Sequence, residues 1–94
     1  MAPSSATVLF QTGYALWRLR REFEALDFLR RALEAEDATA RMHARFIALL
    51  IQADRIDEAQ GQLRAAELLF PGDATLAGVR DRGFQRLDPD QAAA

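Results

Sequence analysis

The chain has 94 residues, half of them apolar and 28% charged, a balance typical of one small globular domain rather than a disordered segment. Its net charge of −2 and pI near 5.3 argue against a nucleic-acid-binding protein, which needs a basic face. With no cysteine it has no disulfide, and a zinc site would have to rely on its single histidine and carboxylates, so we expect no metal and no cofactor.

Helical patterning begins after a lead-in at residues 1–6 that we expect to be flexible. The first helix is predicted at residues 7–19 and the second at residues 22–35, with a pause between them at Arg20 and Arg21. In the second helix, apolar residues recur at three- and four-residue spacing and predict one core-facing side. These residues are Phe23, Leu26, Leu29, Ala32 and Leu33.

Three further helices are predicted. The third follows a break at residues 36–39, where Asp37 or Thr39 is a candidate N-cap, and the fourth occupies residues 56–70. A Pro-Gly-Asp stop signal precedes a more polar last helix at residues 74–87 and a tail at 88–94 that we expect to be disordered. The core residues predicted in these helices are Met42, Phe46, Leu49, Leu50 and Ala53, then Ala59, Leu63 and Ala66, then Leu76, Val79, Phe84 and Leu87. No β-type alternation occurs, so the sequence predicts an all-α protein.

The chain also matches itself when it is shifted so that residue 8 falls on residue 42. When residues 8–37 are aligned with residues 42–71 in this way, seven of the thirty positions are identical. The identical pairs are Leu16 and Leu50, Arg21 and Arg55, Glu24 and Glu58, Ala25 and Ala59, Leu29 and Leu63, Arg30 and Arg64, and Ala32 and Ala66. A period of this length indicates helix-turn-helix repeats, which form scaffolds for binding rather than catalytic folds.

On the Glu-Ala…Leu…Ala pattern of these pairs, the chain resembles the tetratricopeptide repeat family over residues 7–87. The first half of each repeat departs from the family signature: His43 replaces the aromatic opener, Ile47 replaces the glycine, and leucine stands at the tyrosine position of both repeats. The resemblance implies an α-solenoid of two tetratricopeptide-like repeats, at about residues 6–39 and 40–73, followed by a C-terminal capping helix.

The resemblance further implies that the first helix of each repeat and the last helix line a concave surface that binds a peptide or a helix. The implied partner-binding residues are Phe10, Tyr14, Trp17 and Arg18 of the first repeat, Arg41, Ala44, Arg45, Ala48, Ile51 and Gln52 of the second, and Arg82 and Gln85 of the last helix. The four arginines suit an acidic or amphipathic helical partner, because guanidinium groups pair with carboxylates. A solvated arginine-rich surface without a partner is the alternative.

The first helix is apolar on two faces. The stripe that we expect to face the core consists of Val8, Leu9, Ala15, Leu16 and Leu19. A second stripe of Phe10, Tyr14 and Trp17, at i, i+4 and i+7, lies on another face. Exposed together, these aromatic side chains would form a patch of about 500 Å², the size of the largest patch on a typical monomer. Two interpretations stay open: the second stripe binds a partner or another copy, or it is core covered by the N-terminus or the last helix.

No cluster of titratable residues points to catalysis; His43 is expected to be a packing residue, and the glycines form no phosphate-binding loop. We therefore predict a non-catalytic protein–protein interaction module, an adaptor or chaperone for a helical or extended peptide. Its size and layout are similar to those of the bacterial type III secretion chaperones. The alternative is a structural module that self-assembles into homo-oligomers through the first helix, and a third is a regulatory subunit of an enzyme. With no apolar run long enough to span a membrane and no secretory signal, we expect a cytoplasmic protein.

Overall fold

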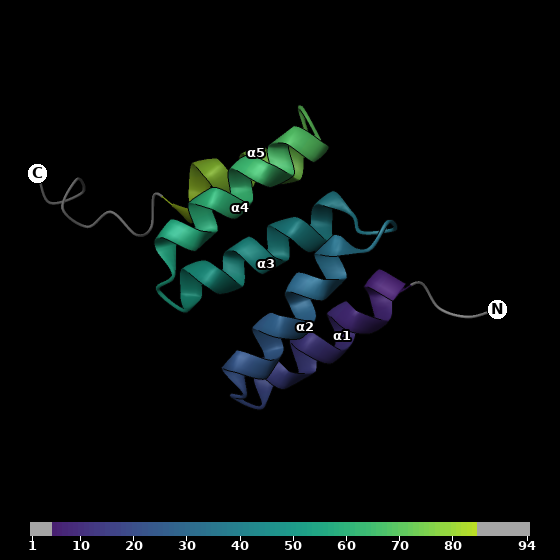
Figure 1. The fold of residues 1–94 in the computed structure, drawn as a ribbon. Helices are drawn as coiled ribbons and strands as arrows, with labels where there is room; N and C mark the ends of the chain where they lie inside the picture. The colour runs from purple at the N-terminus through teal and green to yellow at the C-terminus, as the bar shows by residue number, and fades with distance from the viewer. Residues whose placement is uncertain (1–4, 85–94) are drawn as a thin grey trace, which may run out of the picture. The chain divides into compact units, whose positions relative to one another are not determined.

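In a computed structural model of the chain, which describes residues 5–84, all regular structure is helical (Figure 1). The elements are α1 (Ser5–Arg18), α2 (Glu22–Glu34), α3 (Ala40–Gln52), α4 (Ile56–Leu69), α5 (Ala74–Gly78) and a π-helical segment, η1 (Val79–Gly83). The all-α prediction is confirmed for this part of the chain. The predicted flexible lead-in at residues 1–6 is wrong at its end, because α1 already begins at Ser5. Residues 1–4, the last turn of the predicted final helix with Gln85 and Leu87, and the predicted tail at residues 88–94 lie outside the described residues.

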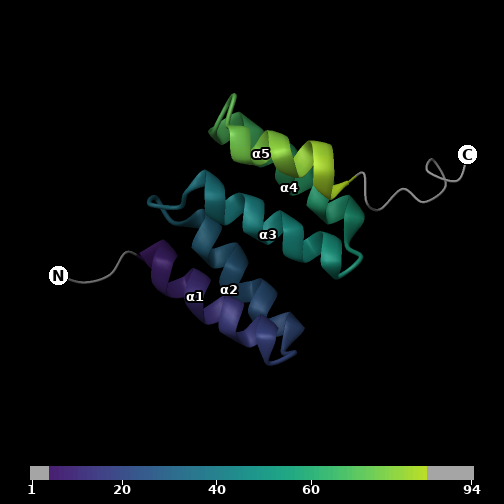
Figure 2. The same ribbon diagram turned by 180° about the vertical axis from the view of Figure 1, so that it is seen from behind.

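The chain divides into two compact units, Met1–Met42 and His43–Ala94, with the boundary inside α3. In the first unit α1 packs against α2 as a helical hairpin, which Figures 1 and 2 show from opposite sides. The carboxylate of Asp37, beyond the end of α2, accepts a hydrogen bond of 3.2 Å from the backbone N–H of Ala6. This bond satisfies a donor that the first turn of α1 would otherwise leave without a helical partner.

Helix α1 packs mainly through a different face from the predicted one, and of the predicted stripe only Leu9 and Leu16 are half-buried. Its buried residues are Ala6, Phe10 and Gly13, whereas Val8 and Leu19, expected in the core, are 43% and 67% exposed. The physical reason is Gly13: a Cβ there would lie 2.7 Å from Cγ of Leu29 and 3.1 Å from the carbonyl oxygen of Ala25. The two helices approach most closely along the side with the smallest residue, and this close approach buries its neighbours rather than the larger aliphatic stripe.

The core face of α2 differs from its prediction at one end. Its buried residues are Ala25, Leu26, Leu29 and Ala32, and Leu33 is half-buried. Phe23 is 86% exposed, so its assignment to the core face is wrong. The centre of the buried face lies about 120° around the helix from Phe23, since successive residues are about 100° apart. Leu33 lies at the border of the buried face of α2, but Phe23 points away from this face.

The turns after α1 and α3 have the same backbone structure. After α1, the N–H groups of Arg20 and Arg21 donate to the carbonyls of Trp17 and Leu16, at 3.0 Å each. After α3, at the corresponding positions of the second repeat, the N–H groups of Asp54 and Arg55 donate to Ile51 and Leu50 at 3.0 and 2.9 Å. Arg20 and Asp54 hold φ angles of 64° and 62°, the left-handed conformation that closes this C-capping motif. The two sequence repeats therefore also have the same turn geometry.

The second unit consists of the rest of α3 with α4, α5 and η1. Nearly all of its predicted core is confirmed: Phe46, Leu49, Leu50, Ala59, Leu63, Ala66 and Leu76 are buried, and Ala53, Val79 and Phe84 are half-buried. Asp73 caps α5 by accepting from the N–H groups of Thr75 and Leu76 at 2.9 and 3.1 Å. An ion pair between Arg80 and Glu67 links η1 to α4.

Candidate functional site

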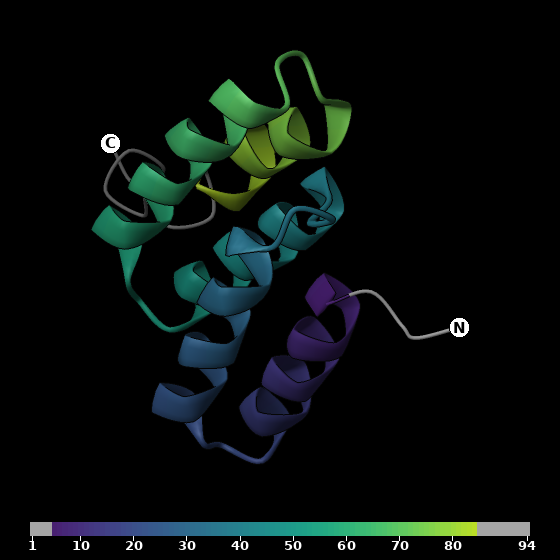
Figure 3. The same cartoon turned by 45° about the vertical axis from the view of Figure 1, so that its right-hand side comes forward.

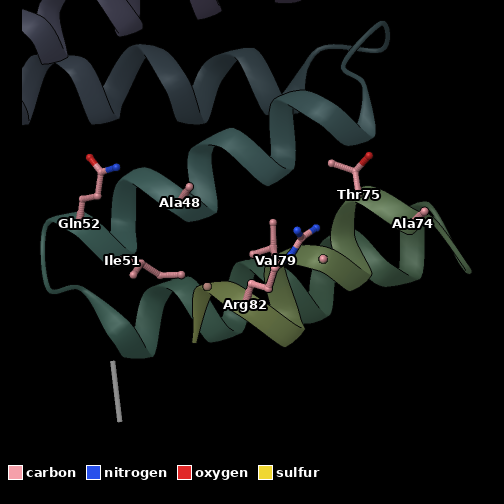
Figure 4. Close-up of a pocket in the computed structure, with 9 residues that line it drawn as sticks. Ala48, Ile51, Gln52, Ala74, Thr75, Val79 and Arg82 are labelled. Atoms are coloured by element: carbon pink, nitrogen blue, oxygen red, sulfur yellow. The ribbon is translucent and has the colours of Figure 1, made fainter. Parts of the chain in front are cut away.

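A groove of about 820 Å³ opens in the second unit between α3 and the α5–η1 segment (Figure 4). Helix α3 contributes one wall, and the shorter helical segment contributes the other. The residues that line it are Ala48, Ile51 and Gln52 of α3, and Ala74, Thr75, Gly78, Val79, Arg82 and Gly83 of the opposite wall. Its volume lies within the range of ligand-binding clefts in proteins.

Two glycines permit close approaches at the α5–η1 wall of the groove. A Cβ on Gly83 would lie 3.2 Å from Cδ1 of Ile51, so the glycine lets η1 approach α3 at this end without a clash. A Cβ on Gly78 would lie 2.9 Å from the guanidinium of Arg82, so the glycine allows this side chain to pack against the backbone of α5. Ile51 and Val79 are the larger apolar groups of the lining, and Gln52 and Thr75 add hydrogen-bonding groups at its borders.

Arg82 supplies the positive charge of the groove. Its side chain is exposed and forms no ion pair with any described residue, whereas its neighbour Arg80 is bound to Glu67. On α3, Arg45 lies one helical turn before Ala48 and therefore on the same side of the helix; it is exposed and also has no ion pair within residues 5–84. A ligand with a carboxylate has one candidate guanidinium partner in the groove, Arg82, and a second, Arg45, on the adjoining surface of α3.

Four of the sequence-predicted partner-binding residues come together in this groove: Ala48, Ile51, Gln52 and Arg82. Arg45 is exposed on the same helix, but Ala44 is buried in the core and offers no surface to a partner. Arg41 is exposed on the part of α3 that belongs to the first unit. Gln85 lies outside the described residues.

The aromatic stripe predicted on α1 does not form one exposed surface. Phe10 is only 8% exposed and belongs to the core of the described chain, so it is not part of an exposed stripe. Tyr14 is exposed and Trp17 is half-buried. Trp17 and Arg18 line a separate, polar hollow of about 510 Å³ together with Arg20 and Glu22 at the end of the α1–α2 hairpin.

The sequence did not identify the wall formed by α5 and η1, except for Arg82. The missed residues are Ala74, Thr75, Gly78, Val79 and Gly83. Their signal in the sequence was the pair of glycines within one helical segment, which often marks a close approach of another group.

His43 is the titratable residue with the most perturbed surroundings. It is 4% exposed, its ring lies against that of Phe70 in an edge-to-face arrangement with centroids 5.4 Å apart, and both ring nitrogens lack a hydrogen-bond partner among the described residues. Desolvation by burial lowers its pKa below the usual 6.5. The predicted packing role agrees with this placement.

Within residues 5–84, no group of three or more histidine, aspartate or glutamate side chains is arranged to hold a metal ion. None of the described helices is long and apolar enough to cross a membrane. No known protein family, no curated protein and no solved structure matches the chain.

Proposed function

We propose that the chain is a non-catalytic, tetratricopeptide-like adaptor or chaperone that binds a protein segment in the groove between α3 and the α5–η1 segment. The observation that carries this proposal is the convergence of Ala48, Ile51, Gln52 and Arg82 on one groove, because the resemblance to the tetratricopeptide family implied these residues as partner-binding from the sequence. The identical backbone turns at corresponding positions of the two repeats support the repeat assignment.

The lining favours an acidic segment of a protein partner. Methyl and methylene groups of Ala48, Ile51 and Val79 provide an apolar surface, and the guanidinium of Arg82 is available to a carboxylate. Arginine at the border of an apolar groove is common in protein interfaces, where it forms bidentate bonds that fix the orientation of the partner. A type III secretion chaperone would use such a groove for an export subunit, and we keep this as the narrower form of the proposal.

A bulky charged side chain in the groove is expected to abolish partner binding. Ala48 is exposed, so Ala48→Arg adds a long side chain to the α3 wall without entering the core. Ala65→Arg, at an exposed position of α4, is the matched control. Partners captured by cross-linking in cells that express each variant would be identified and then titrated against the purified proteins. We expect at least about tenfold weaker binding for Ala48→Arg and unchanged binding for Ala65→Arg. Equal affinities would contradict the proposal.

A specific observation favours a second candidate, self-assembly through α1. The outward stripe of α1 contains Val8 and Ala15, both exposed, and the flanking Leu16 is only half-buried. In α3, the residues that correspond to Ala15 and Leu16 are Leu49 and Leu50, and both are buried. A face that the second repeat buries is thus open in the first, and a second copy of the chain would cover it.

For this candidate, light scattering after size exclusion should show a mass that rises with concentration, and Ala15→Glu should return the protein to a monomer. Ala65→Glu is the control, because it places the same carboxylate at an exposed position of α4. A monomeric wild-type chain at all concentrations would rule this candidate out and leave the groove proposal intact.

A further inference from the structure

The two repeated turns have the same backbone but opposite surface chemistry. The turn after α1 carries Leu19, Arg20 and Phe23, where the turn after α3 carries Ala53, Asp54 and Asp57. Because the hydrogen bonds and the left-handed residue are the same in both, the backbone does not require the side chains of the first turn. The turn geometry therefore does not explain why apolar and basic side chains occur at the first turn.

We call the residues Arg18, Leu19, Arg20 and Phe23 the hairpin tip; Figure 3 shows the turn that contains it at the end of the α1–α2 hairpin farthest from the start of α1. Phe23 is 86% exposed, more than any other large apolar residue of the described chain, and Leu19 is 67% exposed. Leu19 and Phe23 therefore place two large apolar side chains in water beside one turn, and docking on another surface would cover them.

The charges around the tip are basic. Arg18 and Arg20 are exposed and form no ion pair with a described residue, while Arg21 is held by Glu24 at 2.9 Å. Glu22 is the one carboxylate that lines the polar hollow beside the tip. Arg18 and Arg20 therefore make the tip locally positive in a chain whose net charge is −2.

We propose that the hairpin tip docks on an anionic lipid surface. Leu19 and Phe23 would enter the boundary between headgroups and acyl chains, and Arg18 and Arg20 would lie at the level of the anionic headgroups, an arrangement of apolar and basic groups that favours the bilayer interface. The end of a helical hairpin can meet a flat surface without needing a complementary cleft. The turn after α3, with its aspartates at the corresponding positions, would be repelled from the same surface.

The chain contains a built-in reporter of this docking. Trp17 is the single tryptophan and lines the hollow next to the tip together with Arg18 and Arg20. Its emission should shift to shorter wavelength when the tip enters the interface, because the surroundings of the indole ring become less polar. The full chain would be titrated with vesicles of phosphatidylcholine alone and of phosphatidylcholine mixed with phosphatidylserine.

The decisive variant transfers the chemistry of the second turn to the first: Arg20→Asp with Phe23→Asp. Aspartate already occupies the left-handed position in the second turn and the second position of α4, so both substitutions are compatible with the backbone. The matched control is Arg64→Asp with Leu68→Asp on α4, where Arg64 is exposed, without an ion pair in the described chain, and Leu68 is 85% exposed. Both double variants make the same change in net charge.

We expect a blue shift of Trp17 emission with the phosphatidylserine vesicles, none with neutral vesicles, and weaker binding as salt is raised. The tip variant should bind at least about tenfold more weakly than the control variant. Circular dichroism would verify that both keep their helices. Absence of a shift with anionic vesicles, or equal binding by the two variants, overturns the proposal. A shift with polyglutamate but not with vesicles also overturns it and assigns the tip to an acidic protein instead.

Discussion

Replacing Gly13 with alanine is expected to lower the free energy of unfolding by about 2 kcal/mol, although alanine is the better helix former. The added methyl carbon would lie 2.7 and 2.9 Å from Cγ and Cδ2 of Leu29, too close for stable contact. Leu29 is fully buried, and the carbonyl oxygen of Ala25 blocks a second direction at 3.1 Å. The two helices of the hairpin would have to separate, which opens gaps along their whole contact.

Gly61→Ala is the control for this prediction. Gly61 is exposed in α4, and a Cβ there meets nothing within 4 Å. This substitution should raise the free energy of unfolding by about 0.5–1 kcal/mol, because alanine loses less backbone entropy in a helix. Urea denaturation followed by circular dichroism measures both variants. If both alanines stabilise the protein, α1 and α2 are not as close as described.

The second large effect is a loss of folding stability at acidic pH that His43 causes. Burial without a hydrogen-bond partner lowers the pKa of His43, so the folded protein holds the ring neutral while the unfolded chain takes up a proton near the usual 6.5. The unfolded state then binds more protons, and stability falls as the pH drops below about 6.5, by at most about 1.4 kcal/mol per pH unit, until the pH passes below the folded pKa. Above about pH 7.5 His43 is neutral in both states and adds no pH dependence.

His43→Leu should remove this acid sensitivity and also stabilise the protein by about 1–3 kcal/mol, because it eliminates polar atoms that are buried without partners. Leucine stands at the corresponding position of the first repeat, Leu9. Urea denaturation of the untagged wild type and variant between about pH 8 and about pH 5.5 tests both points in a range where few carboxylates titrate. His43 is the only histidine, so a wild-type curve that stays flat over this range would contradict the burial of an unpaired ring.

The sequence predicted the first four helices and most of their ends well because those depend on local signals. The last helix, predicted as one helix at residues 74–87, is instead α-helical only over Ala74–Gly78 and π-helical over Val79–Gly83. Thr39 caps α3 by accepting from the N–H of Met42 at 3.2 Å, and the predicted stop at Pro71 and Gly72 separates α4 from α5. The identity of Leu16 and Leu50, visible in the sequence, falls on the two carbonyls that accept the capping bonds of the turns. Local hydrogen bonding and the internal repeat therefore carried this part of the prediction.

The face of α1 was not predictable from hydrophobicity, since both of its sides are apolar. What decides between them is steric: a glycine permits an approach that a larger residue prevents, and a hydrophobicity pattern gives glycine little weight. The groove likewise could be predicted only in part. Its α3 wall followed from the repeat, but its other wall depends on where α5 and η1 lie, which no local pattern in the chain specifies.

The shared turn geometry also has a practical consequence for protein engineering. Residues 18–20 and 23 surround a backbone whose conformation is maintained by main-chain hydrogen bonds, and the corresponding residues of the second hairpin show that other side chains are accepted there. A combinatorial library at these positions would vary the recognition surface while the helix packing stays constant. The same helical hairpin would then serve as a minimal scaffold on which new binding specificities are selected.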